Sequence, residues 1–186
     1  MIIIGCDPGT SGAIAILDTT TGELNIHDVP SLQIKTKAAG NRKTKSGFRL
    51  KTELDISGLA NLLRPYKFEA HAIIESVHSM PAQGVASVFS FGFAAGALRG
   101  VIETLQIPHT LVTPRAWKKL VLAGMGKEKD ASIARAKQLF PKLASVFLKT
   151  KDGRAESALM AWYGKQTLEK GSSEEKPRRS RLVVQD

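Results

Sequence analysis

The chain begins with the stretch IIIGCDPGTSGAIAIL, residues 2–17, in which two apolar runs flank a glycine-containing turn. The runs Ile2–Cys6 and Ala13–Leu17 predict two β-strands, and a third apolar run, Leu24–Val29, follows a second short turn at residues 18–22. Strands joined by connections this short pair as antiparallel neighbours. The sequence therefore predicts three successive antiparallel strands at the start of the fold.

The next part of the chain alternates between helical and strand-like patterns. A helical pattern at residues 52–64 is followed by Pro65, which cannot continue a helix, and a short β-rich run lies at His71–Glu75. We expect the remaining elements in this order: a helix at 82–105, a strand at 110–112, and helices at 115–122, 130–139 and 154–168. This order predicts an α/β fold in which helices flank a mixed sheet.

Length and charge limit the possible functions. The chain has 186 residues, of which 42% are hydrophobic, so one domain with a substantial core is expected at residues 1–168. Residues 169–186 lack apolar periodicity and predict a basic, disordered tail. The formal net charge of +10 favours nucleic acid as the partner.

Neither a run of eighteen apolar residues nor a signal-peptide pattern is found, so we expect a cytoplasmic protein without membrane contact. Cys6 is the only cysteine, which excludes an intrachain disulfide and a thiolate zinc site, and the four histidines show no metal-ligand spacing. Any bound metal should therefore be a hard cation held by oxygen ligands, such as Mg²⁺ or Mn²⁺.

Four acidic residues lie in positions where an uncompensated carboxylate is unfavourable. Asp7 and Glu75 end apolar strands, and Asp152 and Glu156 lie at the start of a helix. If the strands that end at Asp7 and Glu75 are parallel neighbours, roughly 5 Å apart, their carboxylates repel unless a cation joins them. Asp152 and Glu156 are four residues apart and share one helix face. Taken singly, each acid has an ordinary explanation: a turn residue, a strand-end acid, a helix N-cap and a first-turn acid. Together, in a basic chain, they indicate a metal site.

Several motifs, in their order along the chain, resemble those of RuvC-type Holliday junction resolvases, most closely the phage and chloroplast branch. Three motifs carry the acids: GCDPG at residues 5–9, IIE at 73–75 and DGRAESAL at 152–159. The further matching segments are MPAQG (80–84), FG (91–92) with Gly96, PRAWK (114–118), KDAS (129–132), LFP (139–141) and YG (163–164). The resemblance thus covers almost the whole folded part.

The resemblance implies an RNase H-like fold with a mixed five-stranded sheet, three antiparallel strands followed by parallel ones. It also implies a homodimer whose four carboxylates, Asp7, Glu75, Asp152 and Glu156, bind two Mg²⁺ ions, which Mn²⁺ can replace. Relatives often carry a histidine just before Gly153, where this chain has Asp152, so the division of roles between Asp152 and Glu156 stays open. Lys129 resembles the family's basic residue near the scissile phosphate; its alternative is a solvated lysine at a helix start.

Basic residues and small residues suggest how DNA and a second copy would be held. We interpret residues 35–51 as a long basic loop for DNA phosphates, or alternatively a solvated loop that aids solubility. The expected DNA contacts are Lys35, Lys37, Arg42, Lys43, Lys45, Arg49, Lys51, Arg115, Lys118 and Lys119, with His78 and Met80 in the position where relatives probe the junction. Phe89, Phe91 and Phe93 are interpreted as core or dimer contacts rather than base-stacking groups. The small residues of the helix at 82–105 could allow a close helix approach across a two-fold axis.

The resemblance implies a crossover junction endodeoxyribonuclease of bacterial or phage origin, acting in DNA recombination and repair by paired cutting of four-way junctions. Two alternatives keep the fold: a nuclease for other branched DNA such as flaps and Y-junctions, and a non-catalytic junction-binding protein. A third, an actin-like or sugar-kinase-like ATPase, shares the Asp-to-Gly turn at residues 7–12. It is disfavoured because the chain is too short for two domains and shows no second phosphate motif.

Overall fold

A five-stranded mixed sheet forms the centre of the protein in the computed structural model, which describes residues 1–37, 47–76, 78, 84–126 and 130–172. Its strand order is β3-β2-β1-β6-β7. The strands are β1 (Ile2–Asp7), β2 (Ala13–Asp18), β3 (Leu24–Asp28), β6 (Ala70–Glu75) and β7 (His109–Val112). β1, β2 and β3 pair antiparallel, whereas β6 and β7 continue the sheet in parallel with β1. The predicted fold class is confirmed.

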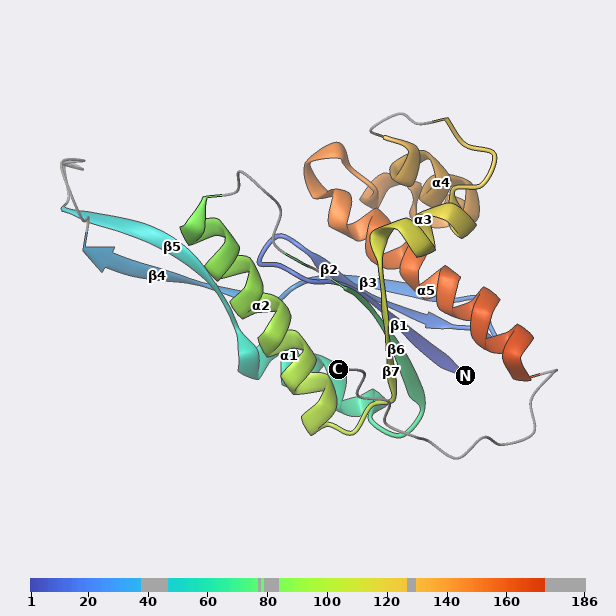
Figure 1. Ribbon diagram of the computed structural model, residues 1–186, viewed down its shortest axis with the longest axis horizontal. Helices are drawn as coiled ribbons and strands as arrows, with labels where there is room; N and C mark the ends of the chain where they lie inside the picture. The colour runs from blue at the N-terminus through green and yellow to red at the C-terminus, as the bar shows by residue number, and fades with distance from the viewer. Residues whose placement is uncertain (38–46, 77, 79–83, 127–129, 173–186) are drawn as a thin grey trace, which may run out of the picture.

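Helices cover both faces of this sheet (Figure 1). One face carries α1 (Ile56–Leu63), which continues into the 3₁₀ turn η1 (Arg64–Tyr66), and the long helix α2 (Val85–Thr104). The other face carries α3 (Pro114–Val121), α4 (Ala131–Leu139) and α5 (Asp152–Ser172). Two further 3₁₀ turns, η2 (Pro141–Val146) and η3 (Lys149–Lys151), lead into α5.

Alternation along β1 builds both layers of the core, because successive strand side chains point to opposite faces. Ile3 is buried in the layer with α5 and Trp117, whereas Ile4 and Cys6 are buried in the layer with α1 and α2. A strand buried on both faces must be apolar throughout, which explains the unbroken run at the start of the chain.

Glycines allow α5 to lie directly on the sheet. A Cβ at Gly5 of β1 would collide with the Ser157 carbonyl and would lie 2.5 Å from the Ala161 nitrogen of α5. A Cβ at Gly164, three residues after Ala161, would lie 2.7 Å from Ile73 on β6. The helix backbone therefore approaches the strands more closely than any side chain at these positions permits.

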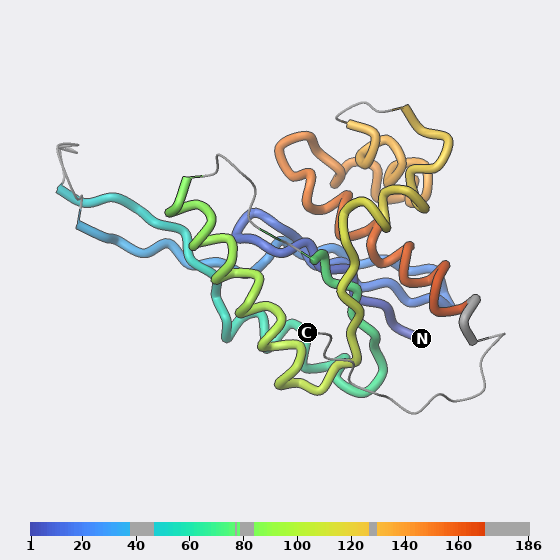
Figure 2. The backbone as a smooth tube through the Cα atoms, viewed as in Figure 1, coloured from blue at the N-terminus to red at the C-terminus, as the bar shows by residue number. Residues whose placement is uncertain are grey.

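The basic segment forms a hairpin, not the loop that we expected. Strands β4 (Ser31–Lys37) and β5 (Phe48–Leu54) pair antiparallel in a second sheet, with Lys35 opposite Leu50 and Lys37 opposite Phe48. Apolar residues alternate with basic and polar ones in both strands, a period-two pattern that the charge run conceals. The hairpin extends away from the central sheet (Figure 2). Three of the predicted DNA contacts, Arg42, Lys43 and Lys45, lie outside the described residues.

Helix α1 begins four residues later than predicted, because the strand β5 runs to Leu54. Asp55 is its N-cap, and the carboxylate accepts a hydrogen bond of 2.9 Å from the Gly58 amide.

At the other end of the chain, α5 extends to Ser172 and so passes the predicted end at residue 168. The predicted disordered tail at 169–186 falls mostly outside the described residues.

The helix α2 exposes much of its apolar surface. Phe89 and Phe93 are 75% and 53% exposed and Phe91 is 37% exposed, so the core alternative for these rings was wrong. By length and composition α2 could cross a membrane: its best window has a mean hydropathy of 1.6, and 22% of it is buried. Core helices of soluble proteins and signal sequences pass the same length and composition test.

We expect Gly5→Ala to destabilise the protein by at least about 3 kcal/mol, because α5 must lift from β1 to admit the methyl group. Chemical unfolding monitored by circular dichroism measures this. Gly84→Ala is the matched control, because a Cβ there meets only Ser87 Oγ at 4.0 Å and the backbone has φ −64°. Equal unfolding midpoints for the two variants would contradict close packing at Gly5.

Candidate metal centre

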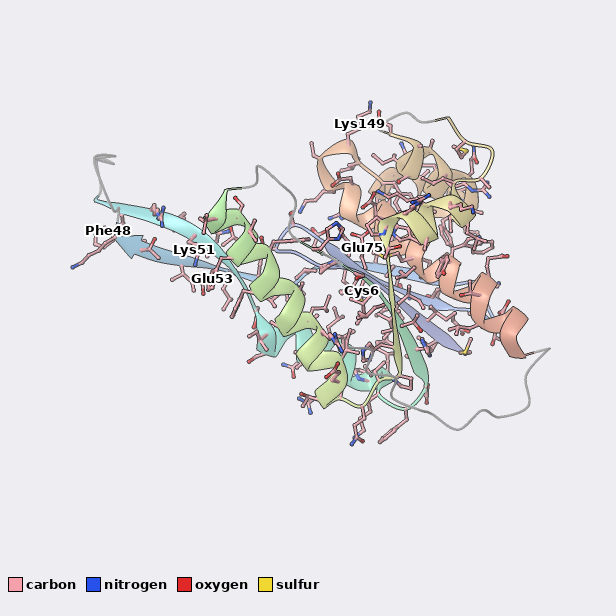
Figure 3. All side chains as sticks on the ribbon, in the orientation of Figure 1. Cys6, Phe48, Lys51, Glu53, Glu75 and Lys149 are labelled. Atoms are coloured by element: carbon pink, nitrogen blue, oxygen red, sulfur yellow. The ribbon has the colours of Figure 1, made fainter. Side chains whose placement is uncertain are left out.

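Three of the four predicted acids converge at one edge of the sheet. One oxygen from each of Asp7, Glu75 and Glu156 lies within 4.8 Å of the others. They come from the end of β1, the end of β6 and the second turn of α5. Residues 149 positions apart are thus brought into one cluster, which Figure 3 locates by the label on Glu75.

Register in the sheet places the first two acids side by side. β1 and β6 are parallel, with Cys6 opposite Ile74, so Asp7 and Glu75 follow on neighbouring strand ends. The predicted parallel arrangement of these two strands is confirmed. The carboxyl ends of parallel strands are where ligands of open α/β sheets bind.

Close packing brings the third acid to them. A Cβ at Gly153 in the first turn of α5 would lie 2.5 Å from Asp7 Oδ2 and 3.1 Å from the Gly12 Cα. The turn after β1 is itself tight, since the Gly12 amide donates to the Gly9 carbonyl over 3.1 Å and Gly9 has φ +136°. Glycine at 12 and 153 therefore lets the start of α5 touch the Asp7 carboxylate, and Glu156 follows one turn later.

The cluster is electrostatically unfavourable without a cation. Burial is the main cause that raises the pKa of Asp7 from 3.8 to about 8, and the neighbouring negative charges, led by Glu156, act in the same direction. Burial also raises the pKa of Glu75 above its ordinary value, although the hydrogen bond from Trp117 opposes this. Carboxylates held together with raised pKa values are typical of functional sites.

Side chains from α3 and α4 hold two of the acids in place. Trp117 Nε1 donates to Glu75 Oε1 over 2.8 Å, and Lys118 Nζ lies 2.7 Å from Glu156 Oε1. Ser132 Oγ makes a longer contact of 3.5 Å to the same oxygen of Glu156. Sequence reasoning missed Trp117 and Ser132. A tryptophan in a short helix was a usable signal, because a buried indole N–H needs an acceptor.

Asp152 is exposed and lies at the rim of the cluster. It lines the same cavity as Asp7, and its charge contributes to the raised pKa of Asp7. Its Oδ1 accepts from the Gly153 amide over 3.1 Å. The structure thus separates the four acids into a close group of three and one peripheral member.

An ion-pair clamp fixes the start of α5 against the end of β3. Arg154 donates to both oxygens of Asp28, from Nε over 2.7 Å and from Nη2 over 2.9 Å, and Lys151 Nζ lies 2.9 Å from Asp28 Oδ2. The hydrogen bond from Arg154 is the main cause that lowers the pKa of Asp28 to about 2. Bidentate Arg–carboxylate pairs fix geometry as well as charge. The clamp therefore orients the helical turn that carries Asp152 and Glu156.

Among the described residues, the predicted DNA contacts other than Lys118 are not part of this cluster. Arg115 and Lys119 are exposed on α3, and His78 is exposed after β6. Lys35, Lys37, Arg49 and Lys51 lie on the hairpin. Lys129 and Met80 lie outside the described residues. Lys118, predicted as a phosphate contact, instead pairs with Glu156, so it lies inside the acidic site.

The donor set fits a hard divalent cation. Asp7, Glu75 and Glu156 could hold one metal ion with oxygen ligands alone, as Mg²⁺ and Mn²⁺ prefer. Cys6 precedes Asp7 but is buried in the core layer with α1 and α2, so its thiol is not offered to the cluster.

These elements define an α/β fold of the RNase H-like class. Neither a protein-family model nor a curated protein sequence matches the chain. Among solved structures, Thermus thermophilus RuvC is 15% identical, covers 92% of this chain and 97% of its own, and gives a TM-score of 0.51. T. thermophilus RuvC in complex with a Holliday junction substrate is 13% identical with the same coverage and a TM-score of 0.55. The chain therefore has a RuvC-like fold, while the phage and chloroplast branch stays a prediction.

We expect Asp7→Asn to stabilise the metal-free protein at pH 8. The folded state keeps a proton on Asp7 up to about pH 8, whereas the unfolded chain releases it near 3.8, so wild-type stability falls as pH rises through this window. Asparagine removes the charge, and we expect a gain of about 2 kcal/mol at pH 8 that shrinks towards pH 4. Thermal unfolding in chelator measures it.

The exposed acid Glu69 provides the control for this variant, since Glu69→Gln should leave the pH profile unchanged. Added Mg²⁺ should stabilise the wild type more than Asp7→Asn, because a ligand stabilises only the state that binds it. A lower melting temperature for Asp7→Asn in chelator at pH 8, or equal stabilisation by Mg²⁺, would contradict the assignment.

We expect Asp28→Asn to weaken Mg²⁺ binding, because the clamp then holds the start of α5 through fewer hydrogen bonds. Titration calorimetry measures this. The depressed pKa of Asp28 also predicts a stability difference from wild type of about 1 kcal/mol, present above pH 4 and lost as pH falls towards 2. Asp18→Asn is the control, since Asp18 also has a lowered pKa but is the last residue of β2, outside the acidic cluster. Unchanged Mg²⁺ affinity in Asp28→Asn would exclude the clamp from positioning the acids.

Proposed function

We propose that the chain is a metal-dependent endonuclease that resolves four-way DNA junctions, a crossover junction endodeoxyribonuclease. The convergence of Asp7, Glu75 and Glu156 at the carboxyl edge of a RuvC-like sheet carries this proposal. The fold is shared with a RuvC that was solved in complex with a Holliday junction substrate, which supports branched DNA as the substrate class. The net charge of +10 around an acidic site suits a polyanion that is cut at a metal centre.

In the proposed site, Asp7, Glu75, Glu156 and the peripheral Asp152 hold two Mg²⁺ ions. When bound, such a pair activates water and stabilises the leaving oxygen of a phosphodiester. Trp117 fixes the orientation of Glu75 through its indole N–H. Lys118 pairs with Glu156 and would be free to contact the scissile phosphate once Glu156 holds a cation, a role proposed also for Lys129.

The hairpin and α3 supply the proposed DNA surface. Lys35, Lys37, Arg49 and Lys51 project from a two-stranded arm, and Arg115 and Lys119 are exposed on α3 next to the site. Phosphate contacts of this kind position DNA and make affinity depend on salt. The proposed setting is DNA recombination or repair in the cytoplasm of a bacterial or phage-infected cell.

A homodimer is proposed because α2 presents an open face of small and aromatic residues. Gly92, Gly96 and Gly100 recur every four residues, and a Cβ added at any of them meets no atom of the described residues within 4 Å. Phe89 and Phe93 border this stripe and are exposed. A two-fold interface here would let rings of one helix approach the glycines of the other and would place one active site on each of two strands.

Cleavage of a labelled synthetic junction tests the function. We expect wild-type protein with Mg²⁺ to cut four-way junctions in symmetric pairs, and Glu156→Gln to lose activity on the order of 100-fold or more, because a ligand of the metal is removed. Glu169→Gln, later on the same helix, is the matched control. Cutting of flaps or Y-forks but not of junctions would favour the alternative substrate, and binding without cutting would favour a non-catalytic protein.

We expect Gly96→Leu to give a monomer at concentrations where the wild type is a dimer, because the added side chain keeps the two α2 helices apart. Analytical ultracentrifugation measures the mass, and junction assays should then show single nicks instead of paired cuts. Lys137→Leu places the same leucine side chain at an exposed position of α4 and serves as the control. Equal masses for wild type and Gly96→Leu would place the interface elsewhere.

A further inference from the structure

A cavity of about 600 Å³ opens directly beside the acids. Asp7, Asp152 and the turn after β1 are part of its lining. One wall is the first part of α2 and the other is β5 of the hairpin. The residues of the two walls are Ala86, Ser87, Ser90 and Phe91 on α2, and Arg49, Leu50 and Lys51 on β5.

The two walls differ in chemistry. On the α2 wall the ring of Phe91 lies against the turn, since a Cβ at Gly9 would be 3.5 Å from Phe91 Cε2, and the ring is still 37% exposed. Ser87 and Ser90 add hydroxyl groups to this wall. On the β5 wall Arg49 and Lys51 are exposed cations, and Figure 3 shows Lys51 on the hairpin where β5 passes α2.

The cations are available to a strong anion. Arg49 Nε donates to Thr36 Oγ1 across the hairpin over 3.3 Å, which orients a guanidinium that carries further N–H donors. Lys51 Nζ lies 2.9 Å from Glu53 Oε1 in an exposed pair, and such pairs are weak enough for a phosphate to compete with them. An aromatic face opposite two cations, across a gap of this volume, suits a flat apolar ring linked to a phosphate.

We propose that this cavity receives one unpaired nucleotide of the strand to be cut, with its base on Phe91 and its phosphate at Arg49 and Lys51. The inference rests on the proposed function and deepens it, because it names a local strand opening next to the cut as the feature that is recognised. A base within a continuous duplex is stacked and offers no free face to Phe91. Aromatic side chains beside a basic track are how proteins hold single strands.

The cavity continues into a second one along the hairpin, and the two together define a path for the bound DNA strand. A second cavity of about 380 Å³ shares Thr10, Arg49, Lys51, Ala86 and Ser90 with the first and adds Phe89 and Phe93. Glu53 and Leu54 also line it, so the second cavity carries an acidic side chain beside the two cations. The nucleotide nearest the metal centre is therefore held best.

A dimer formed through α2 would leave the first cavity open, because Phe89 and Phe93 line the second one and not the first. Phe89 and Phe91 are two residues apart on a helix and so point about 200° away from each other. Phe89 borders the glycine stripe, whereas Phe91 faces the turn after β1. Base contact at Phe91 and dimer contact at Phe89 are thus compatible.

Two fluorescent probes separate base contact from phosphate contact: a short oligothymidylate and an abasic chain with the same number of phosphates. Anisotropy titrations in chelator with the full chain should show that the wild type prefers oligothymidylate by about tenfold. Phe91→Leu keeps apolar bulk but removes the aromatic face and should abolish most of this preference, as should Phe91→Ala. Arg49→Gln should weaken both probes alike and keep the preference. Phe68→Ala, at an exposed phenylalanine far from the cavity, should behave as wild type.

Equal binding of the two probes by the wild type overturns the proposal, and so does an unchanged preference in Phe91→Leu. The comparison of the two probes on the wild-type protein tests the proposal even if a variant fails to fold. Since no metal is present, the result is independent of cleavage: loss of junction cutting with a retained base preference would defeat the proposed function and leave the cavity as a strand-binding site.

Discussion

The close approach of α5 to β1 is the constraint on which the rest of the structure depends. At Gly5 and Gly164 the helix backbone lies against the strands, and at Gly153 its first turn touches the Asp7 carboxylate. These contacts fix both the height and the rotation of α5 over the sheet. Glu156 can reach acids on β1 and β6 only in that position, because a glutamate side chain is short relative to the usual spacing of about 10 Å between packed layers.

This packing produces a site that opposes folding. Burial raises the pKa of Asp7 and of Glu75, and each neighbouring carboxylate increases the effect on Asp7. Lys118 relieves part of the repulsion through its ion pair with Glu156. The stability contributed by the apolar core therefore has to offset the unfavourable free energy of these buried carboxylates. A divalent cation bound there would neutralise their charge.

Much of the fold was predictable because strong local signals coincide with it. The apolar runs gave β1, β2 and β6, and the predicted parallel pairing of β1 with β6 brought Asp7 and Glu75 together. The hairpin was missed because a run of basic residues resembles a loop, while its alternation is visible only when both strands are compared. The tryptophan in a short helix signalled a buried indole that needs an acceptor, but which acid Trp117 and Ser132 contact depends on how α3 and α4 pack on α5. The clamp at Asp28 joins residues 126 positions apart, which no local pattern reveals.

The hairpin has its root at the same place as this clamp. The Val29 amide, next to Asp28, donates to the Gly12 carbonyl over 3.1 Å, and the Asp55 amide donates to Pro30 over 2.8 Å where the arm returns. Any displacement of the arm must therefore strain bonds to the turn after β1 and to the first turn of α5. The hairpin thus extends away from the sheet, and it is attached to the rest of the protein beside the carboxylates. The bonds at the base of the arm therefore couple its position to the turn that packs against Gly153 and Asp7.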